Sequence, residues 1–192
     1  MGLLIAGLAL FIATHLVPAA TTFRAGLIGR LGDGGYKGLF SLVSLAGVVL
    51  IVMGYNAARD AGPPLIWDPP VAMRHITLLL MLPVFVFFVS TYFPGRIKSA
   101  LKHPMLVSVK LWALAHLLAN GDLASMLLFS SLLAWAVVDR ISLKRRTREA
   151  SEPTMPGPAM RNDGIAVVVG LGAYAAIAFW LHPILFGVPV IG

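Results

Sequence analysis

The 192-residue sequence is 58% hydrophobic and only 12% charged, which excludes a typical soluble domain and indicates a chain whose solvent is lipid. The net charge of +7 does not indicate nucleic-acid binding, because the basic residues collect in connections without interleaved aromatic residues or zinc-ligand spacing. The lack of cysteine excludes disulfides, thiolate metal sites and covalently attached haem.

Six apolar segments follow one another along the chain, most of them long enough to cross about 30 Å of hydrocarbon as a helix. They are 3–20, 38–55, 74–93, 104–119, 123–138 and 164–191. Segments this long and unbroken do not fit the alternating strands of a β-barrel. The sequence therefore predicts an all-α, polytopic membrane protein, a bundle of about six transmembrane helices.

The sequence also marks the connections between these segments and an expected kink within one of them. No Lys or Arg precedes the first segment, so we expect a retained helix instead of a secretory signal peptide. The connection 21–37 is basic and rich in glycine, and its run 32–35 predicts a flexible turn. The proline-rich connection 56–73 surrounds Trp67, which we expect to anchor at the membrane interface. Pro83 predicts a kink in the third segment.

Lys and Arg are distributed unevenly among the connections. Twelve lie in the first, third and fifth, whereas the second has only Arg59 and, at its junction with the third segment, Arg74. Since basic connections stay in the cytoplasm, the sequence predicts that both termini are periplasmic. We expect residues 1–192 to form a single transmembrane domain, in which the basic, proline-containing stretch 140–162 is a flexible cytoplasmic loop.

The five histidines differ in their expected depth. They are His15, His75, His103, His116 and His182. An ionisable group inside a spanning helix is costly and is functional by default. At 1.5 Å per residue, His15 lies about 18 Å below the outer surface and His116 about 20 Å above the cytoplasmic one. Both are therefore expected in the middle of the membrane, while the other three fall at helix ends.

Two mid-membrane imidazoles on different helices suit axial ligation of a haem iron in a chain without cysteine. Alternatively, each imidazole hydrogen-bonds a polar group on a neighbouring helix. Lys110, inside the fourth segment, either extends its ammonium group to the cytoplasmic interface or contacts an anionic ligand such as a haem propionate.

The run from His103 to His116, followed by Asn120-Gly121-Asp122, resembles the NnrU family of bacterial membrane proteins. Other positions that look like the family are His15, Arg24, the run 35–42 and His182-Pro183, so the resemblance covers nearly the whole chain. The family is associated with nitrite and nitric oxide metabolism in denitrifying bacteria. The resemblance therefore implies a bacterial inner-membrane protein connected with denitrification.

The zeta-carotene isomerase of plants and cyanobacteria is similar over the same motifs and is understood to be a haem b membrane protein. Carried over by motif, its axial histidines fall on His15 and His116. That relative has a cysteine three residues before its second ligand, where this chain has Ala113. The difference counts against a ligand-switching isomerase mechanism.

The leading hypothesis is a membrane protein that binds haem b through His15 and His116, with Lys110 beside the cofactor, and serves redox or nitrogen-oxide metabolism. One alternative is a haem-free accessory factor that assembles a membrane enzyme through lateral helix contacts with a protein partner. Close helix contacts are permitted by Gly164, Gly170 and Gly172. Further alternatives are an isomerase related to zeta-carotene isomerase and a methyltransferase acting on isoprenylated cysteine, whose nucleotide-binding segment is not recognisable here.

Overall fold

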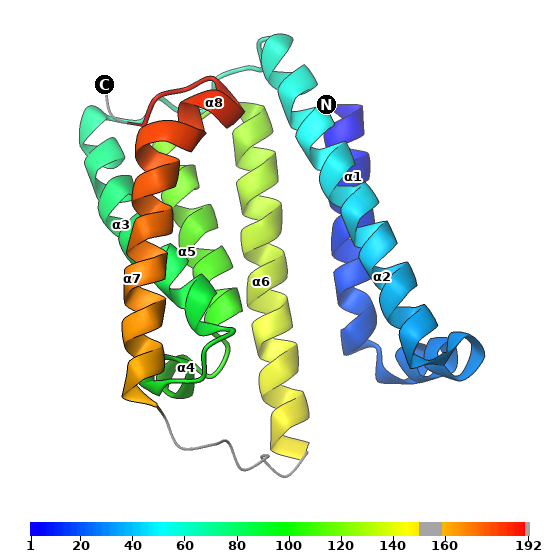
Figure 1. The fold of residues 1–192 in the computed structure, drawn as a ribbon. Coiled ribbons are helices and arrows are strands. Elements are labelled where there is room, and N and C mark those ends of the chain that lie inside the picture. Colours follow the sequence, from blue (N-terminus) through cyan, green and yellow to red (C-terminus); the bar gives the residue numbers. More distant parts are fainter. Residues whose placement is uncertain (150–158, 191–192) are drawn as a thin grey trace. The chain divides into compact units, whose positions relative to one another are not determined.

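The regular structure in the described part of the chain, residues 1–149 and 159–190 of a computed structural model, is helical (Figure 1). The helices are α1 (Gly2–Leu16), η1 (Val17–Ala19), α2 (Thr21–Asp60), α3 (Val71–Ser90), α4 (Arg96–Leu101), α5 (Pro104–Ala119), α6 (Leu123–Glu149), α7 (Met160–Ala176), η2 (Ile177–Leu181) and α8 (His182–Phe186). The predicted all-α class is confirmed.

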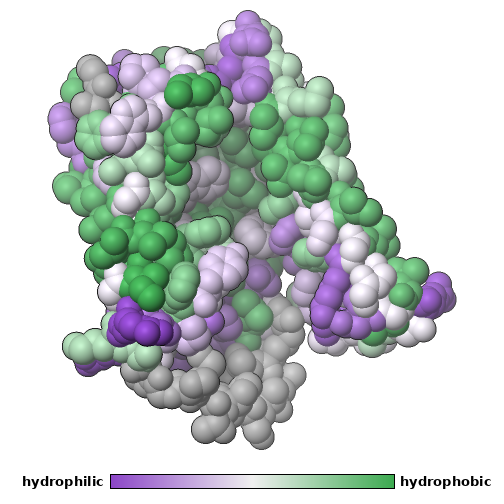
Figure 2. Space-filling view, in the orientation of Figure 1, coloured by the Kyte–Doolittle hydropathy of each residue, from purple (hydrophilic) through white to green (hydrophobic). Residues whose placement is uncertain are grey.

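Several helices are suited to a lipid environment. Among the described residues, five stretches are long and apolar enough to cross a membrane: Gly2–Ala19, Thr21–Asp60, Val71–Ser90, Leu123–Arg145 and Met160–Phe186. The helix α5 is apolar but shorter, at 16 residues. Figure 2 shows large hydrophobic areas on the face in view, as expected for a protein surrounded by hydrocarbon. The count of six spanning helices and the side on which the termini lie stay predictions.

The chain divides into two compact units, of which unit 1 comprises Met1–Pro69 and Asn120–Glu149. Within it, α1 and α2 lie side by side (Figure 1). The helix α6 contacts both. Glycines allow the close approach of α1 and α2: a Cβ at Gly7 would lie 2.6 Å from the Ile51 nitrogen, and one at Gly47 would lie 3.0 Å from Phe11 Cβ. The two backbones therefore pack closely, as small residues permit in membranes.

Unit 2 comprises Pro70–Ala119 and Ala150–Gly192, of which 159–190 are described in the second stretch. Here α3 packs against both α5 and α7. The buried Ser108 hydroxyl of α5 donates to the Val84 carbonyl of α3 over 2.8 Å. The Tyr174 hydroxyl of α7 donates to the Leu78 carbonyl of α3 over 3.3 Å. The next carbonyl along α3 is the one that lacks a helical N–H donor, because Pro83 has no N–H.

The connection 21–37 is helical except for one break, and this break lies at the start of the run 32–35, for which a flexible turn was predicted. The segment belongs to α2, and the only residue there with non-helical backbone angles is Gly32, whose φ of +71° favours glycine. Phe23, Leu27 and Leu31 repeat every four residues, which gives the stretch before the break an apolar helical face. The glycines therefore supply one sharp break, and the flanking residues stay helical.

The basic stretch 140–162 is also more helical than predicted. The helix α6 continues to Glu149 because residues 140–149 contain neither Gly nor Pro, and α7 already begins at Met160. Residues 150–158 lie outside the described part, so the flexibility of the loop stays a prediction. Helix α8 ends at Phe186, before the end of the predicted apolar segment 164–191. Gly187 follows it as a left-handed C-cap (φ +68°).

The proline-rich connection of unit 1 pairs with the turn before α6. Ile66 donates its backbone N–H to the Gly121 carbonyl over 2.7 Å, and Leu123 donates to the Pro64 carbonyl over 3.0 Å. Gly121 is buried, and a Cβ there would collide with the Trp67 carbonyl. The motif Asn120-Gly121-Asp122 therefore needs glycine at its centre for this close approach.

Candidate functional site

His15 lies near the end of α1 in unit 1, inside a cluster of aromatic rings. Its ring stacks on Phe11 at a centroid distance of 4.0 Å and meets Phe40 of α2 and Trp135 of α6 edge-on, each at 5.2 Å. Its Nδ1–H donates to the Phe11 carbonyl over 2.9 Å. In the neutral imidazole, this bond places the lone pair on Nε2, the nitrogen that a metal would take.

Two polar groups of unit 1 are buried without a hydrogen-bond partner among the described residues, the indole N–H of Trp135 and the hydroxyl of Ser44. Trp135 belongs to the His15 cluster, and Ser44 lies one helical turn beyond Phe40 on α2. Buried polar groups are nearly always paired, so an orphan donor next to the imidazole indicates a place where a ligand or water supplies the partner.

His116 lies near the end of α5 in unit 2 and repeats one feature of His15. Its Nδ1–H donates to the carbonyl of Trp112, four residues earlier, over 2.9 Å, and its ring lies 5.1 Å from the Trp112 ring. The lone pair of its neutral form is therefore also on Nε2. Ala113, on the same helix, is fully buried.

Lys110 is half-buried on α5, six residues before His116. No hydrogen bond or ion pair of its ammonium group is found within the described part of the chain. Whether it extends to the interface or contacts an anionic ligand stays a prediction.

The other three histidines have different surroundings. His75 is exposed near the start of α3. His103 is half-buried just before α5, where its carbonyl accepts the Val107 N–H over 3.3 Å. His182 begins α8 and donates from Nδ1 to the Val188 carbonyl over 2.7 Å, which ties down the chain after the helix. All three lie at or near helix ends, where the sequence placed them.

The two candidate iron ligands belong to different units, His15 to unit 1 and His116 to unit 2. Lys110 also belongs to unit 2. Their joint ligation of one iron therefore stays a prediction. The described residues contain no group of three His, Cys, Asp or Glu side chains placed to hold a bare metal ion. Haem binding requires fewer protein ligands, because the porphyrin supplies four of the iron ligands and the protein supplies only one or two axial side chains.

A polar chain in unit 1 was missed by the sequence reasoning. Asp122 precedes α6 and accepts the Ser125 backbone N–H with Oδ1 (3.0 Å) and the Ser125 hydroxyl with Oδ2 (2.5 Å). Ser125 is fully buried, and the Tyr55 hydroxyl lies 2.8 Å from its oxygen. Since an ionised carboxylate only accepts, Ser125 donates to Asp122 and Tyr55 donates to Ser125. An Asp directly before an apolar helical run was the available signal for the cap.

The comparisons agree with the resemblance seen in the sequence. A family model described as NnrU protein matches residues 3–190, which is nearly the whole chain. No curated protein matches the sequence, and no solved structure does. The chain belongs to the NnrU family of membrane proteins.

Proposed function

We propose that this NnrU family protein binds haem b with His15 and His116 as axial ligands and serves redox or nitrogen-oxide metabolism in the bacterial inner membrane. The surroundings of His15 support the proposal most. Its ring is oriented by the Phe11 carbonyl, is flanked by three aromatic rings, and lies beside a buried indole N–H for which the described residues supply no partner.

Each residue has a distinct role in this proposal. The Nδ1–H bonds to the Phe11 and Trp112 carbonyls hold the two imidazoles in the tautomer that ligates through Nε2 and raise the basicity of that nitrogen. Aromatic rings around His15 restrict its rotation. Lys110 offers a cation for a carboxylate of the cofactor. Bound haem b would supply one-electron exchange between ferric and ferrous iron.

The test is a reduced-minus-oxidised visible spectrum of the full chain, purified in detergent from cells supplied with ample haem. We expect a sharp b-type spectrum that His15→Ala or His116→Ala abolishes or converts to a five-coordinate form. His75→Ala is the matched control, because His75 is exposed, and its spectrum should equal that of the unmodified protein.

A second pair of measurements separates a lost ligand from a lost fold. Adding imidazole to His15→Gly should restore the spectrum if the residue is an axial ligand, since the small molecule occupies the vacated position. Circular dichroism should show unchanged helix content in every variant. A folded, colourless protein in the presence of haem would sink the proposal and favour the haem-free accessory factor.

A further inference from the structure

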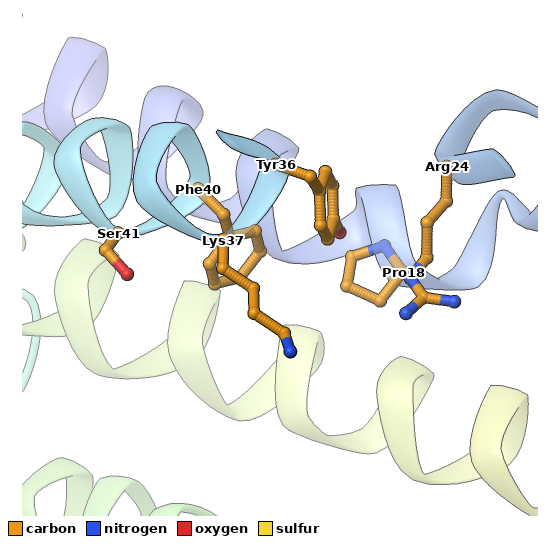
Figure 3. A pocket seen from close by; sticks show the side chains of 6 residues that line it. All are labelled: Pro18, Arg24, Tyr36, Lys37, Phe40 and Ser41. Atoms are coloured by element: carbon orange, nitrogen blue, oxygen red, sulfur yellow. The ribbon is translucent and has the colours of Figure 1, made fainter. Parts of the chain in front are cut away.

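An open pocket of about 450 Å³ lies within unit 1, around the beginning of α2. Its lining residues are Pro18, Arg24, Tyr36, Lys37, Phe40 and Ser41 (Figure 3). The volume falls in the range of small-molecule sites, roughly 300 to 1,000 Å³. Two of the six residues are cationic and two carry hydroxyl groups, so the chemistry of the lining suits an anion.

The break at Gly32 creates this pocket. Arg24 and Tyr36 are twelve residues apart, and in an unbroken helix they would lie about 18 Å apart along the axis. In the structure, the Arg24 guanidinium lies over the Tyr36 ring, 5.6 Å from its centroid. The left-handed φ of Gly32 therefore folds the first part of α2 back, and the buried Tyr36 ring holds the guanidinium in place.

The positive charge of the pocket comes mainly from Arg24. Lys37 already pairs with Asp33, with Nζ 2.5 Å from Oδ2. Arg24 has no carboxylate partner among the described residues. Figure 3 shows the cationic ends of Arg24 and Lys37 on the same side of the pocket. A guanidinium held by an aromatic face keeps its planar N–H donors available for a phosphate or carboxylate.

The remaining wall is apolar and leads toward the His15 cluster. Phe40 lines the pocket, and the same ring meets His15 edge-on at 5.2 Å. We propose that this pocket binds the anionic head of a membrane amphiphile, either a lipid phosphate or a propionate of haem, with Arg24 as the principal contact. The inference does not depend on the haem proposal, because a phospholipid satisfies it without haem.

The experiment uses native mass spectrometry of the full chain in detergent, with phosphatidylglycerol and diacylglycerol as probes. Arg24→Ala should weaken phosphatidylglycerol binding by about tenfold, the size expected for one charge-assisted contact, and leave binding of diacylglycerol, which has no phosphate, unchanged. A parallel arm compares retention of haem with retention of its dimethyl ester, whose propionates carry no charge.

The chain provides a matched control. Arg59 lies over the Tyr55 ring at 5.8 Å, which is the same kind of contact without the pocket, so Arg59→Ala should change neither arm. Gly32→Ala should reproduce the effect of Arg24→Ala, because a non-glycine residue is strained at that φ, whereas Gly38→Ala, with open space around it, should not. Arg24→Lys keeps the charge and should retain part of the affinity if Arg24→Ala fails to fold.

A selective loss of phosphatidylglycerol in Arg24→Ala supports a lipid phosphate. A selective loss of haem over its dimethyl ester supports a propionate. If phosphatidylglycerol and haem each bind Arg24→Ala as well as they bind Arg59→Ala, the pocket is not an anion site and the inference is overturned.

Discussion

Asp163, in the first turn of α7, accepts the backbone N–H of Arg96, in the first turn of α4, over 2.9 Å. Its second oxygen accepts the Ile97 N–H over 3.0 Å, so one carboxylate satisfies two unpaired donors of a six-residue helix. Its neighbour Asn162 donates to the Pro94 carbonyl over 2.7 Å. This pair joins the start of α7 to the turn that follows α3.

Asp163→Ala should therefore destabilise unit 2 by about 1 to 2 kcal/mol, because both N–H groups lose their acceptor and a negative charge at a helix N-terminus is removed. The measurement is thermal unfolding in detergent. Asp68→Ala removes an exposed carboxylate from unit 1 and should leave the midpoint unchanged. Equal midpoints for the two variants would contradict the capping role.

Gly170 is the glycine of α7 that packs closely against another helix. A Cβ there would lie 2.6 Å from Val86 Cα, whereas Gly164 and Gly172 have open space around them. Gly170→Ala should cost roughly 1 to 3 kcal/mol, because α3 and α7 must separate to admit the methyl group. Gly172→Ala, two residues away, should be neutral or slightly stabilising. Melting curves of the two variants test the difference.

The spans were predictable from sequence because the length of an apolar run and the thickness of the hydrocarbon are both set by simple geometry. The position of the break in α2 was harder to predict. Four glycines near residue 32 look alike in the sequence, yet only Gly32 leaves the helical conformation. Which glycine breaks the helix depends on where the α2 segments find tertiary contacts, and that information is not local.

The candidate site was likewise only partly predictable from the sequence. His15 and His116 stood out because a titratable group is rare within apolar runs. The partners of His15 come from α2 and α6, so only the fold brings Phe40 and Trp135 to it. The pairing of Arg24 with Tyr36 likewise follows from the break at Gly32.

The hydroxyls of Tyr55 and Ser125 should be energetically coupled. Ser125→Ala leaves the Tyr55 hydroxyl and one Asp122 oxygen without their partner, at a cost of about 1 to 3 kcal/mol. Tyr55→Phe removes one end of the same chain. A double-mutant cycle on unfolding free energies should give a coupling of about 0.5 to 3 kcal/mol. Additive effects would show that the 2.8 Å contact between the two oxygens contributes nothing.

Trp135→Phe tests whether the orphan indole N–H belongs to a binding site. No partner for this buried donor is found in the described part of the chain, so replacing the indole by a phenyl ring removes an unpaired group that costs about 1 to 3 kcal/mol. The phenyl ring retains an aromatic contact with His15. We therefore expect ligand-free stability to stay level or rise. With haem supplied, the same variant should bind it more weakly if the N–H donates to a bound group or to its water. A clear loss of stability without ligand would show that the protein itself pairs this donor.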